Sequence, residues 1–483
     1  MGLMLLAIWN RLLSAILTGN RASAIDISSS RLVVLLCLCL TIPAHAEIIQ
    51  GYPNLPDAAQ GNAFASSPIL DSAVAIPLIN ETWLEVPAPP SATLASKAPN
   101  QIGVAVHIPS GQRGLPALTL DSAWTKIGEH RYARLTIRSA NAVSVRAGVI
   151  ISSAFPGRIL PVSAAGKVES EFKRSVGISW SPTSEGDTLT LLVETPAGYG
   201  YREGDITIPA ISHIDTDPLG EAGNGFANIN PGTASCTVDL ACAWSSVYKN
   251  AGASVMKIVF TKDGSTYACS GTLLADSARS YKPYVYTANH CIGNQAVADS
   301  VITYWNLQYA SCNAYNNGMP DGVIKLSNGA QFLHNSVEND HAFLLLNDSP
   351  PTGALFSGWN SDALTPYIDV TTISHPMGDV KKITFGWGNN PITGSITVSG
   401  IKLTDIWNIK ISQGTLQAGS SGSGLFTCDD QSCYLRGGAT AVNNFEICAI
   451  IQQAYFSRFD IAYPALKFWL GPPVPSTLIF NDW

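Results

Sequence analysis

Apolar residues occur in this chain in short runs, and turn-forming residues separate the runs. Five runs rich in β-branched residues lie at 132–137, 143–151, 176–180, 188–194 and 205–211. Runs of this length between turns are typical of β-strands, whereas a helix needs a longer stretch with a helical period. Together with 41 glycines, the pattern predicts an all-β protein in which residues 101–214 form a small β-sandwich.

Length and composition describe a large globular chain. A length of 483 residues predicts more than one domain. A hydrophobic content of 46% and a charged content of 13% exclude a disordered or fibrous chain. The net charge of −7 disfavours nucleic acid or an anionic membrane surface as a partner. Nothing in the composition requires more than a monomer.

The N-terminus has the pattern of an export signal. Arg31 precedes an apolar run at 32–40, and an A-x-A pattern at 44–46 predicts cleavage after Ala46. The run is too short to span a membrane comfortably. Residues 1–30 add a second apolar stretch before a complete signal, which we interpret as a mis-assigned start, with an uncleaved anchor as the alternative. We expect a secreted or periplasmic protein without a stable membrane span after cleavage of residues 1–46.

Cysteine usage agrees with export. Cys37 and Cys39 lie in the signal, so eight of the ten cysteines remain, an even number that suits disulfides in an oxidising compartment. Their spacing alone leaves the pairing open. The chain contains no C-x-x-C pair and no H-E-x-x-H motif, so the sequence predicts no metal site and no cofactor.

Two further segments differ in composition from the β-rich regions. Residues 47–100 are rich in Pro, Ala and Ser, which predicts a mobile leader. Residues 215–231 contain Gly, Asn and Pro and form a predicted linker suited to a maturation cut. The linker contains no Lys or Arg, so self-cleavage after a basic residue is not supported there.

A glycine-rich hexapeptide at 419–424 suits a serine nucleophile. Glycines on both sides of Ser421 allow the backbone to turn sharply, so that the N–H groups of Gly419 and Ser421 can face one point beside a free hydroxyl. Such a turn would combine a nucleophile with an oxyanion hole. Ser420 and Ser423 are the competing nucleophiles, and the competing interpretation of the segment is a flexible loop.

A histidine and an aspartate precede this serine in suitable contexts. His290 follows the apolar run 284–286 in T-A-N-H-C, at the end of a predicted strand and beside a cysteine that can hold it. Asp340 precedes the apolar run 342–346 and can orient an imidazole from a buried position, with Asp348 as the alternative. We expect the remaining histidines of this region to be structural or on the surface, namely His334, His341 and His375.

These three stretches resemble the trypsin/chymotrypsin superfamily in their motifs and in their order. The segments 269–274, 302–306, 357–360 and 374–376 further resemble the secreted bacterial lysyl endopeptidase group. The resemblance covers most of residues 232–470. It implies a protease domain at 232–483 with two six-stranded β-barrels. It also implies a triad of His290, Asp340 and Ser421, and an oxyanion hole at Gly419 and Ser421.

The resemblance implies two further features. Related bacterial proteases carry long N-terminal propeptides, so the β-rich domain at 101–214 is expected to be a pro-domain that assists folding and inhibits the enzyme, and a binding or spacer module is the alternative. The implied disulfides are Cys236–Cys448, Cys242–Cys312 and Cys269–Cys291, which leaves Cys428 and Cys433 for a local loop.

The specificity pocket departs from the families that the chain resembles. Trypsin carries its pocket aspartate six residues before the nucleophile, where this chain has Thr415. The pocket-wall strand at 438–442 contains no histidine, and the segment 449–456 after Cys448 contains no acid. An uncharged pocket would leave a lysine ammonium unpaired, so lysine or arginine preference is doubtful. The predicted pocket residues are Thr415, Ala439, Thr440 and Ala441.

Glu446 and Asp460 flank this region and could serve a cationic substrate side chain instead, although such carboxylates are usually solvated. The sequence therefore predicts a secreted serine endopeptidase, made as a precursor, that acts on protein or peptide substrates. The alternative is a non-enzymatic secreted or surface binding protein in which the N-terminal β-domain binds and the barrels are a scaffold.

Overall fold

The computed structural model describes residues 48–54, 79–98, 100–172, 177–219, 233–312, 314, 322–398, 400–442 and 446–472. The chain divides after Ala46 into two units, and all described residues belong to the second. The predicted signal peptide at 1–46, including the uncertain start at 1–30, lies outside the described residues, as does most of the linker at 215–231. No helix within the described ranges is long and apolar enough to cross a membrane.

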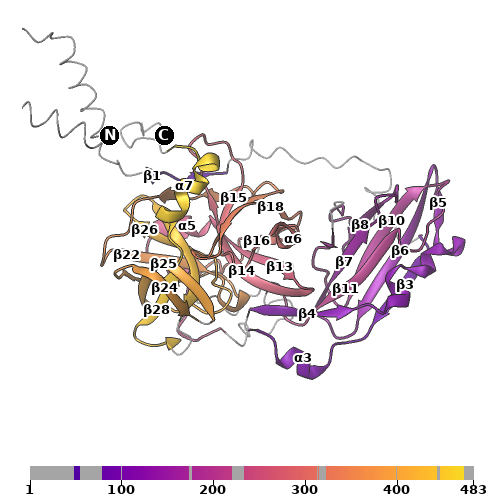
Figure 1. Cartoon of the computed structure of the whole chain (residues 1–483), viewed down its shortest axis with the longest axis horizontal. Coiled ribbons are helices and arrows are strands. Elements are labelled where there is room, and N and C mark those ends of the chain that lie inside the picture. Colours follow the sequence, from indigo (N-terminus) through magenta and orange to yellow (C-terminus); the bar gives the residue numbers. More distant parts are fainter. Residues whose placement is uncertain are drawn as a thin grey trace, which may run out of the picture. The chain divides into compact units, whose positions relative to one another are not determined.

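The N-terminal domain is a sandwich of two β-sheets (Figure 1). One sheet contains β3 (Glu81–Val86), β5 (Thr125–Ile127), β6 (His130–Ser139), β8 (Arg158–Val162) and β10 (Thr188–Pro196). The facing strands are β4 (Gln101–His107), β7 (Ser144–Ile151), β9 (Ser179–Trp180) and β11 (Ile206–Ile214). Apolar side chains of both sheets, such as Leu135 and Val149, form one core cluster. The predicted β-sandwich is confirmed.

The first β-barrel contains seven strands. They pair in the order β17-β16-β13-β14-β15-β19-β18. Their bounds are β13 (Val255–Lys262), β14 (Ser265–Leu274), β15 (Tyr284–Thr287), β16 (Ile302–Trp305), β17 (Ile324–Leu326), β18 (Ala330–Ser336) and β19 (His341–Leu346). No pairing among the described strands joins β18 to β17, so the barrel is open on that side.

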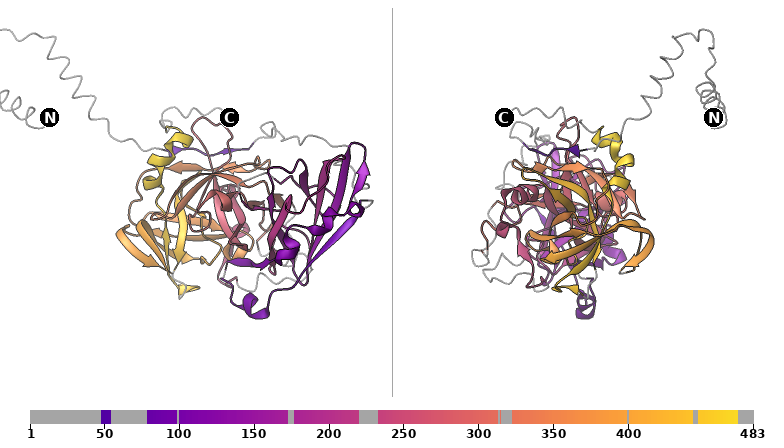
Figure 2. Two further views of the ribbon diagram at one scale, coloured as in Figure 1. Left: turned by 45° about the vertical axis from the view of Figure 1, so that its right-hand side comes forward. Right: turned by 90° about the vertical axis from the view of Figure 1, so that its left-hand side faces the viewer.

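The second β-barrel is a closed ring of six strands, seen from two further directions in Figure 2. Each strand pairs with the next in the order β22, β23, β25, β28, β27, β26. Their bounds are β22 (Asp369–Ser374), β23 (Lys382–Gly388), β25 (Ile401–Gln413), β26 (Gly424–Cys428), β27 (Cys433–Val442) and β28 (Gln452–Phe456). The two predicted barrels are both present, but only the second is a closed six-stranded barrel; the first is an open barrel with seven described strands instead of the predicted six.

Short elements connect the strands, and one longer helix follows the second barrel. This helix, α7 (Phe459–Leu470), packs against β27. The others are β12 (Val238–Asp239), β24 (Ile392–Val398), α3 (Ser91–Ala95), α4 (Ser110–Arg113), α5 (Ser246–Gly252), α6 (Gln295–Ala298) and the 3-10 helices η3 (Pro116–Thr119), η4 (Asp121–Ala123), η6 (Leu240–Cys242) and η7 (Pro376–Gly378).

One sheet of the sandwich continues into the first barrel. β4 pairs with β11 on one side and with β14 on the other, where Gly103 lies opposite Thr266. The side chain of Arg146, on β7, is buried and donates to Thr261 Oγ1 and to Ser300 O, both at 2.8 Å. The N-terminal domain and the first barrel therefore share backbone pairing and buried polar contacts.

The segment that directly follows the predicted signal peptide is ordered. β1 (Ile48–Ile49) pairs with β21 (Gly358–Asn360), and β2 (Tyr52–Pro53) pairs with β20 (Leu355–Phe356). Residues 79–98 also contain β3 and α3. The prediction of a mobile leader at 47–100 is wrong for both stretches, because pairing with distant strands orders segments whose composition favours disorder.

Candidate active site

His290 and Asp340 meet at the ends of neighbouring strands of the first barrel. β15 pairs with β19, so the turn after Thr287 lies beside the turn that precedes His341. Asp340 accepts two hydrogen bonds from His290: Oδ1 from the backbone N–H and Oδ2 from Nδ1, each at 2.8 Å. The Asp340 side chain is 1% exposed and the His290 side chain 25% exposed. One buried carboxylate therefore orients the imidazole, while the imidazole remains accessible to solvent.

The backbone at Asp340 adopts an unusual conformation that serves this contact. Its φ is +52°, in the left-handed region, which aspartate tolerates better than most residues other than glycine. Its carbonyl also accepts a hydrogen bond from the N–H of Asn289 at 3.3 Å. The carboxylate and the carbonyl of one residue thus hold two successive residues of the histidine turn.

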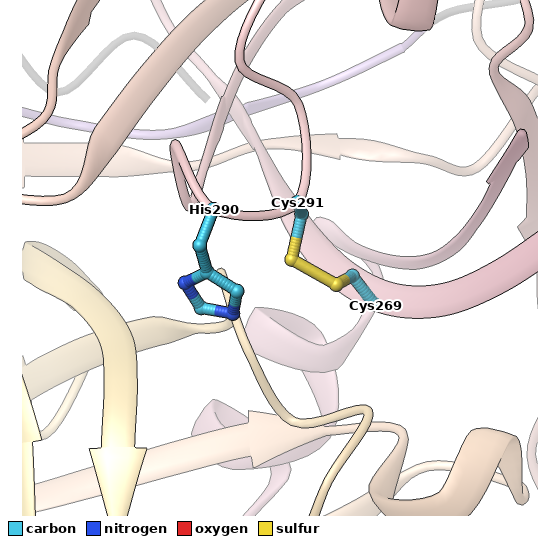
Figure 3. A group of neighbouring side chains, drawn as sticks. All are labelled: Cys269, His290 and Cys291. Atoms are coloured by element: carbon cyan, nitrogen blue, oxygen red, sulfur yellow. A yellow bond between two sulfur atoms is a disulfide. The ribbon is translucent and has the colours of Figure 1, made fainter. Parts of the chain in front are cut away.

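A disulfide fixes the other side of the histidine turn. Cys291 is joined to Cys269 of β14, and Figure 3 shows the two bonded sulfurs beside the ring of His290. The ligand atoms of these three residues lie within 4.8 Å of one another, a spacing that would fit a metal ion. A disulfide offers no thiolate, however, so this group does not fit a metal site.

Ser421 lies in a tight turn between β25 and β26. Gly419 and Gly422 have φ values of +91° and +81°, so both need the conformational freedom of glycine. A Cβ on Gly422 would come within 2.2 Å of Thr287 Oγ1, so the serine turn packs directly against the strand end that leads to His290. The turn that carries Ser421 therefore lies beside the strand end that leads to the hydrogen-bonded pair of His290 and Asp340.

Ser270 holds the serine turn and was not singled out from the sequence. Its N–H donates to the carbonyl of Ser421 at 2.8 Å and its hydroxyl to the carbonyl of Gly419 at 2.9 Å. It follows Cys269, whose disulfide holds the histidine turn. Its position in the family-like segment 269–274 was the only sequence signal for this role.

The turn leaves two backbone donors available. Within the described part of the chain, the N–H groups of Gly419 and Ser421 form no hydrogen bond. The loop at 375–378 supports the turn from behind, because the Met377 N–H donates to Ala418 O at 2.6 Å and a Cβ on Gly419 would lie 2.7 Å from His375 O. Two donors held in this way can stabilise an oxyanion.

The competing serines occupy other environments. Ser420 is 2% exposed, and its hydroxyl lies 3.1 Å from that of Ser374. Ser423 is fully buried. Ser421 alone of the three is partly exposed. The G-x-S-G frame and the exposure therefore select the same serine.

The other candidates for the triad have structural environments. Asp348 accepts hydrogen bonds from the backbone N–H and the side chain of Asn328. Burial lowers the pKa of His341 to about 3, with His334 adding to this effect, and Nδ1 of His341 lies 3.2 Å from Asn339 Oδ1. Burial alone lowers the pKa of His334. These residues therefore have structural roles and do not belong to the candidate triad.

His375 is also structural. It is fully buried, and its Nδ1 lies 2.8 Å from Asp379 O. Burial holds its pKa well below the usual value, and the nearby lysines, Lys381 first, lower it further. The neutral ring therefore stabilises the loop behind the serine turn.

The predicted pocket residues border the serine turn. Ala439 accepts a hydrogen bond from the Gly422 N–H at 2.7 Å, so the wall strand at 439–441 lies beside Ser421. Thr415 is 1% exposed, and its hydroxyl has no hydrogen-bond partner among the residues that the structure describes. Sequence analysis missed Gln452, whose side chain accepts from the Leu416 N–H at 2.8 Å and donates to the Leu416 carbonyl at 3.0 Å. A buried amide thus stabilises the segment that carries Thr415.

Both flanking carboxylates have partners. Asp460 forms an ion pair with Arg458 at 2.5 Å, and the guanidinium of Arg458 lies 4.3 Å from the ring centroid of Trp407. Glu446 accepts a hydrogen bond from the backbone N–H of Gln453 at 2.5 Å. Asp460 is therefore already neutralised by a cation of the chain, whereas Glu446 is held by a neutral backbone donor.

The other cystines brace both barrels and the connections between them. The structure contains the pairs that the resemblance implies, including the local one: Cys236–Cys448, Cys242–Cys312 and Cys428–Cys433. The first two join residues 212 and 70 positions apart, so they restrict the unfolded chain more than the five-residue loop of the third.

Comparison with known proteins gives consistent matches along the chain. The model of the lysyl endopeptidase C-terminal domain matches residues 232–445, and that of the lysyl endopeptidase N-terminal domain matches residues 76–215. A lysyl endopeptidase of Pseudomonas aeruginosa is 32% identical over 437 residues, which cover 87% of this chain and 89% of that protein.

Solved structures with a similar fold share less sequence. The active form of the Rv3671c protease of M. tuberculosis has a TM-score of 0.34 and 16% identity, over 51% of this chain and 94% of that chain. The MamO protease domain of Magnetospirillum magneticum has a TM-score of 0.31 and 12% identity, over 45% of this chain and 98% of that chain.

Proposed function

Since the chain belongs to the lysyl endopeptidase family of serine proteases, we propose that its peptide-bond hydrolysis uses His290, Asp340 and Ser421 as a catalytic triad. The observation that carries the proposal is the pair of hydrogen bonds from His290 to the buried carboxylate of Asp340. The glycine-flanked turn of Ser421, packed against the same strand end, supports it.

The mechanism follows from these groups. His290 Nε2 takes the proton of the Ser421 hydroxyl as the oxygen attacks the peptide carbonyl, and it then gives the proton to the leaving amine. Asp340 accepts from Nδ1, which fixes the tautomer and stabilises the imidazolium. A water molecule then attacks the carbonyl of the acyl-enzyme while His290 takes its proton. His290 next returns that proton to the Ser421 oxygen as the ester bond breaks and the product acid leaves. No step needs a metal or a cofactor.

The oxyanion forms beside the N–H groups of Gly419 and Ser421, which donate to no other group in the described residues. Each such donor contributes about 3 kcal/mol to transition-state stabilisation in enzymes of this kind. The bonds from Ser270 to the flanking carbonyls keep both N–H groups in place before the substrate arrives.

We further propose that the protein is exported as a precursor and that the sandwich at 101–214 is its propeptide, with the maturation cut in the linker 215–231. The signal pattern and four disulfides support export. The pairing of β4 with β14 and the buried contacts of Arg146 support a propeptide that associates with the protease domain.

The preferred substrate residue is an uncharged one. The region around Thr415 presents a buried hydroxyl and small wall residues, and the two nearby carboxylates bind other groups. A lysine ammonium buried there without a partner would cost about 3–5 kcal/mol. In this respect the chain would differ from the relative that carries the name lysyl endopeptidase.

The test is covalent labelling of the purified, secreted and processed protein with diisopropyl fluorophosphate, followed by peptide mapping. We expect label on Ser421, no label in Ser421→Ala, and unchanged labelling in the matched control Ser423→Ala. Label on another serine would contradict the triad. Absence of label from every form, with no peptide cleavage, would favour the alternative function as a binding protein on a protease-like scaffold.

A further inference from the structure

We propose that residues 48–54, here called the N-terminal strap, are a docking peptide for the segment that joins the two barrels. We propose further that the strap stays bound to the protease domain after the propeptide is cut. The second part rests on the precursor role proposed above, whereas the first part does not.

The strap adds strands to the protease domain by backbone pairing. Ile48 and Ile49 lie opposite Asn360 and Trp359, and Tyr52 lies opposite Phe356 in an antiparallel register. The strap therefore extends the sheet as an added edge strand, a mode of peptide binding that uses main-chain groups for affinity.

The segment on which the strap lies, residues 350–360 and here called the seat, contacts both barrels. The Ser357 N–H donates to Leu273 O of β14 in the first barrel, and Trp359 lies opposite Leu435 of β27 in the second. The apolar cluster around the seat contains Ile49 of the strap together with residues of both barrels. The strap thus binds to the connecting segment that contacts both barrels.

Tyr52 is the main side-chain anchor. It is 5% exposed, stacks on Phe356 with ring centroids 5.0 Å apart, and meets Tyr281 edge-on at 5.3 Å. The guanidinium of Arg279 lies 5.8 Å from the centroid of the Tyr52 ring. A buried aromatic with stacked, edge-on and cationic neighbours is typical of an interface hot spot.

Asn54 closes the end of the strap. Its N–H donates to Ala354 O at 2.7 Å, and its carbonyl accepts from the Gly353 N–H at 3.3 Å. Its side-chain amide donates to the carbonyls of Pro350 and Pro351 at 2.8 and 3.2 Å. Side-chain and backbone bonds from one residue therefore set the register of the whole segment.

Two glycines make the approach of the two backbones possible. A Cβ on Gly51 would lie 2.6 Å from Phe356 O and 2.9 Å from the nitrogen of Gly358. A Cβ on Gly358 would lie 2.3 Å from Ile49 O, and its three nearest atoms all belong to the strap. Neither glycine has a positive φ, so close packing rather than backbone conformation requires it. The fit between strap and seat is mutual.

These contacts do not depend on the sandwich. Every partner named for the strap lies between residues 279 and 360 in the protease domain. A cut in the linker 215–231 therefore leaves all of them in place. The mature domain would otherwise expose the apolar seat around Phe356, so retention of the strap keeps this surface covered.

The first test uses the full-length chain with Ser421→Ala, so that no cleavage occurs, and a fluorescent peptide of residues 47–54. Gly51→Val should displace the strap, and anisotropy should then show binding of the peptide at least tenfold tighter than to the chain with the native strap. Gly111→Val is the matched control, since a Cβ at Gly111 meets no atom within 4 Å, and it should behave as the native chain.

A peptide that itself carries Gly51→Val should bind at least tenfold more weakly than the native peptide, a comparison that does not depend on the folding of any variant. Equal binding of both peptides, or equal binding of the native peptide to all three chains, would overturn the docking proposal. Because this test needs no catalysis, its outcome is independent of the triad assignment.

The second test is native mass spectrometry of the processed enzyme purified after expression of the full chain. We expect a bound peptide that contains residues 48–54 and lacks the sandwich at 101–214, in a one-to-one complex, released by denaturation and absent from the Gly51→Val form. A processed native enzyme that carries no such peptide would overturn retention. Peptide binding without diisopropyl fluorophosphate labelling would refute the proposed triad and leave the docking site standing.

Discussion

Arg146 offers a quantitative test of the contact between the sandwich and the protease domain. Its guanidinium is buried and donates to Ser181 O within the sandwich at 2.7 Å. It also donates to Thr261 Oγ1 and Ser300 O in the protease domain at 2.8 Å. Burial lowers its pKa to about 9, so the group remains charged at neutral pH. Of the three hydrogen bonds that Arg146 donates, only the two to the protease domain contribute to the association of the two domains.

Replacement of Arg146 by methionine keeps most of the apolar volume and removes both intermolecular donors. A hydrogen bond from a charged group contributes about 1.5–3 kcal/mol, and part of the loss is recovered because the guanidinium no longer has to be desolvated. Thr261 also retains a neighbour, since its hydroxyl lies 3.1 Å from that of Thr266. We therefore expect a loss of about 3 kcal/mol, which is roughly a 150-fold weaker complex.

The assay uses chains that also carry Gly51→Val, so that the strap does not tether the fragment, and measures dissociation of the cleaved propeptide from the processed enzyme by size exclusion and by recovery of peptidase activity. The control is Arg138→Met on β6, because Arg138 is about half exposed and pairs with Asp187 of the same domain. It should change the dissociation constant less than threefold. Wild-type affinity in a correctly folded Arg146→Met protein would refute the role of these two bonds.

Three further outcomes test the site and its surroundings. Asp340→Asn should lower kcat by about 10⁴-fold in a peptidase assay, because an amide cannot accept both bonds from His290 and favours the wrong tautomer. Thr415→Asp should shift cleavage toward lysine and arginine in mass-spectrometric mapping of a digested protein mixture, since it adds a carboxylate at the buried pocket position. Burial lowers the pKa of Lys381 to about 7, so above pH 7 the unfolded chain binds more protons at this residue than the folded chain does. Lys381 should therefore add about 2 kcal/mol to the free energy of unfolding between pH 7 and 9, and in urea titrations Lys381→Met should reduce the rise of the wild-type protein by this amount.

The candidate site could be predicted because its chemistry is encoded locally. T-A-N-H-C lies at the end of a strand, Asp340 directly precedes one, and Ser421 lies between glycines whose φ values are positive as the turn requires. Each motif is short and its conformation depends on its own residues. The β-sandwich was also predictable, since strand runs and turn signals are local patterns.

The supporting contacts could not be predicted, because they join residues far apart in the chain. Ser270 holds the carbonyl of Gly419, and Gln452 holds the backbone of Leu416, yet a serine or a glutamine carries no signal for such roles. Lys257 is similar: its ammonium is buried and donates to Pro218 O and Gly378 O, and burial lowers its pKa to about 8. Composition describes such residues only as polar or charged.

The N-terminal strap shows why composition misled at 47–100. A short segment with few apolar residues cannot form a core by itself, and Pro, Ala and Ser around it favour an extended chain. An extended chain, however, is already in the conformation that an added strand needs, so pairing with a preformed edge costs less ordering than formation of a helix would. The signal lies in the match between Gly51 and Gly358, two glycines that each leave room for the other backbone, and that match becomes visible only when the two segments are placed side by side.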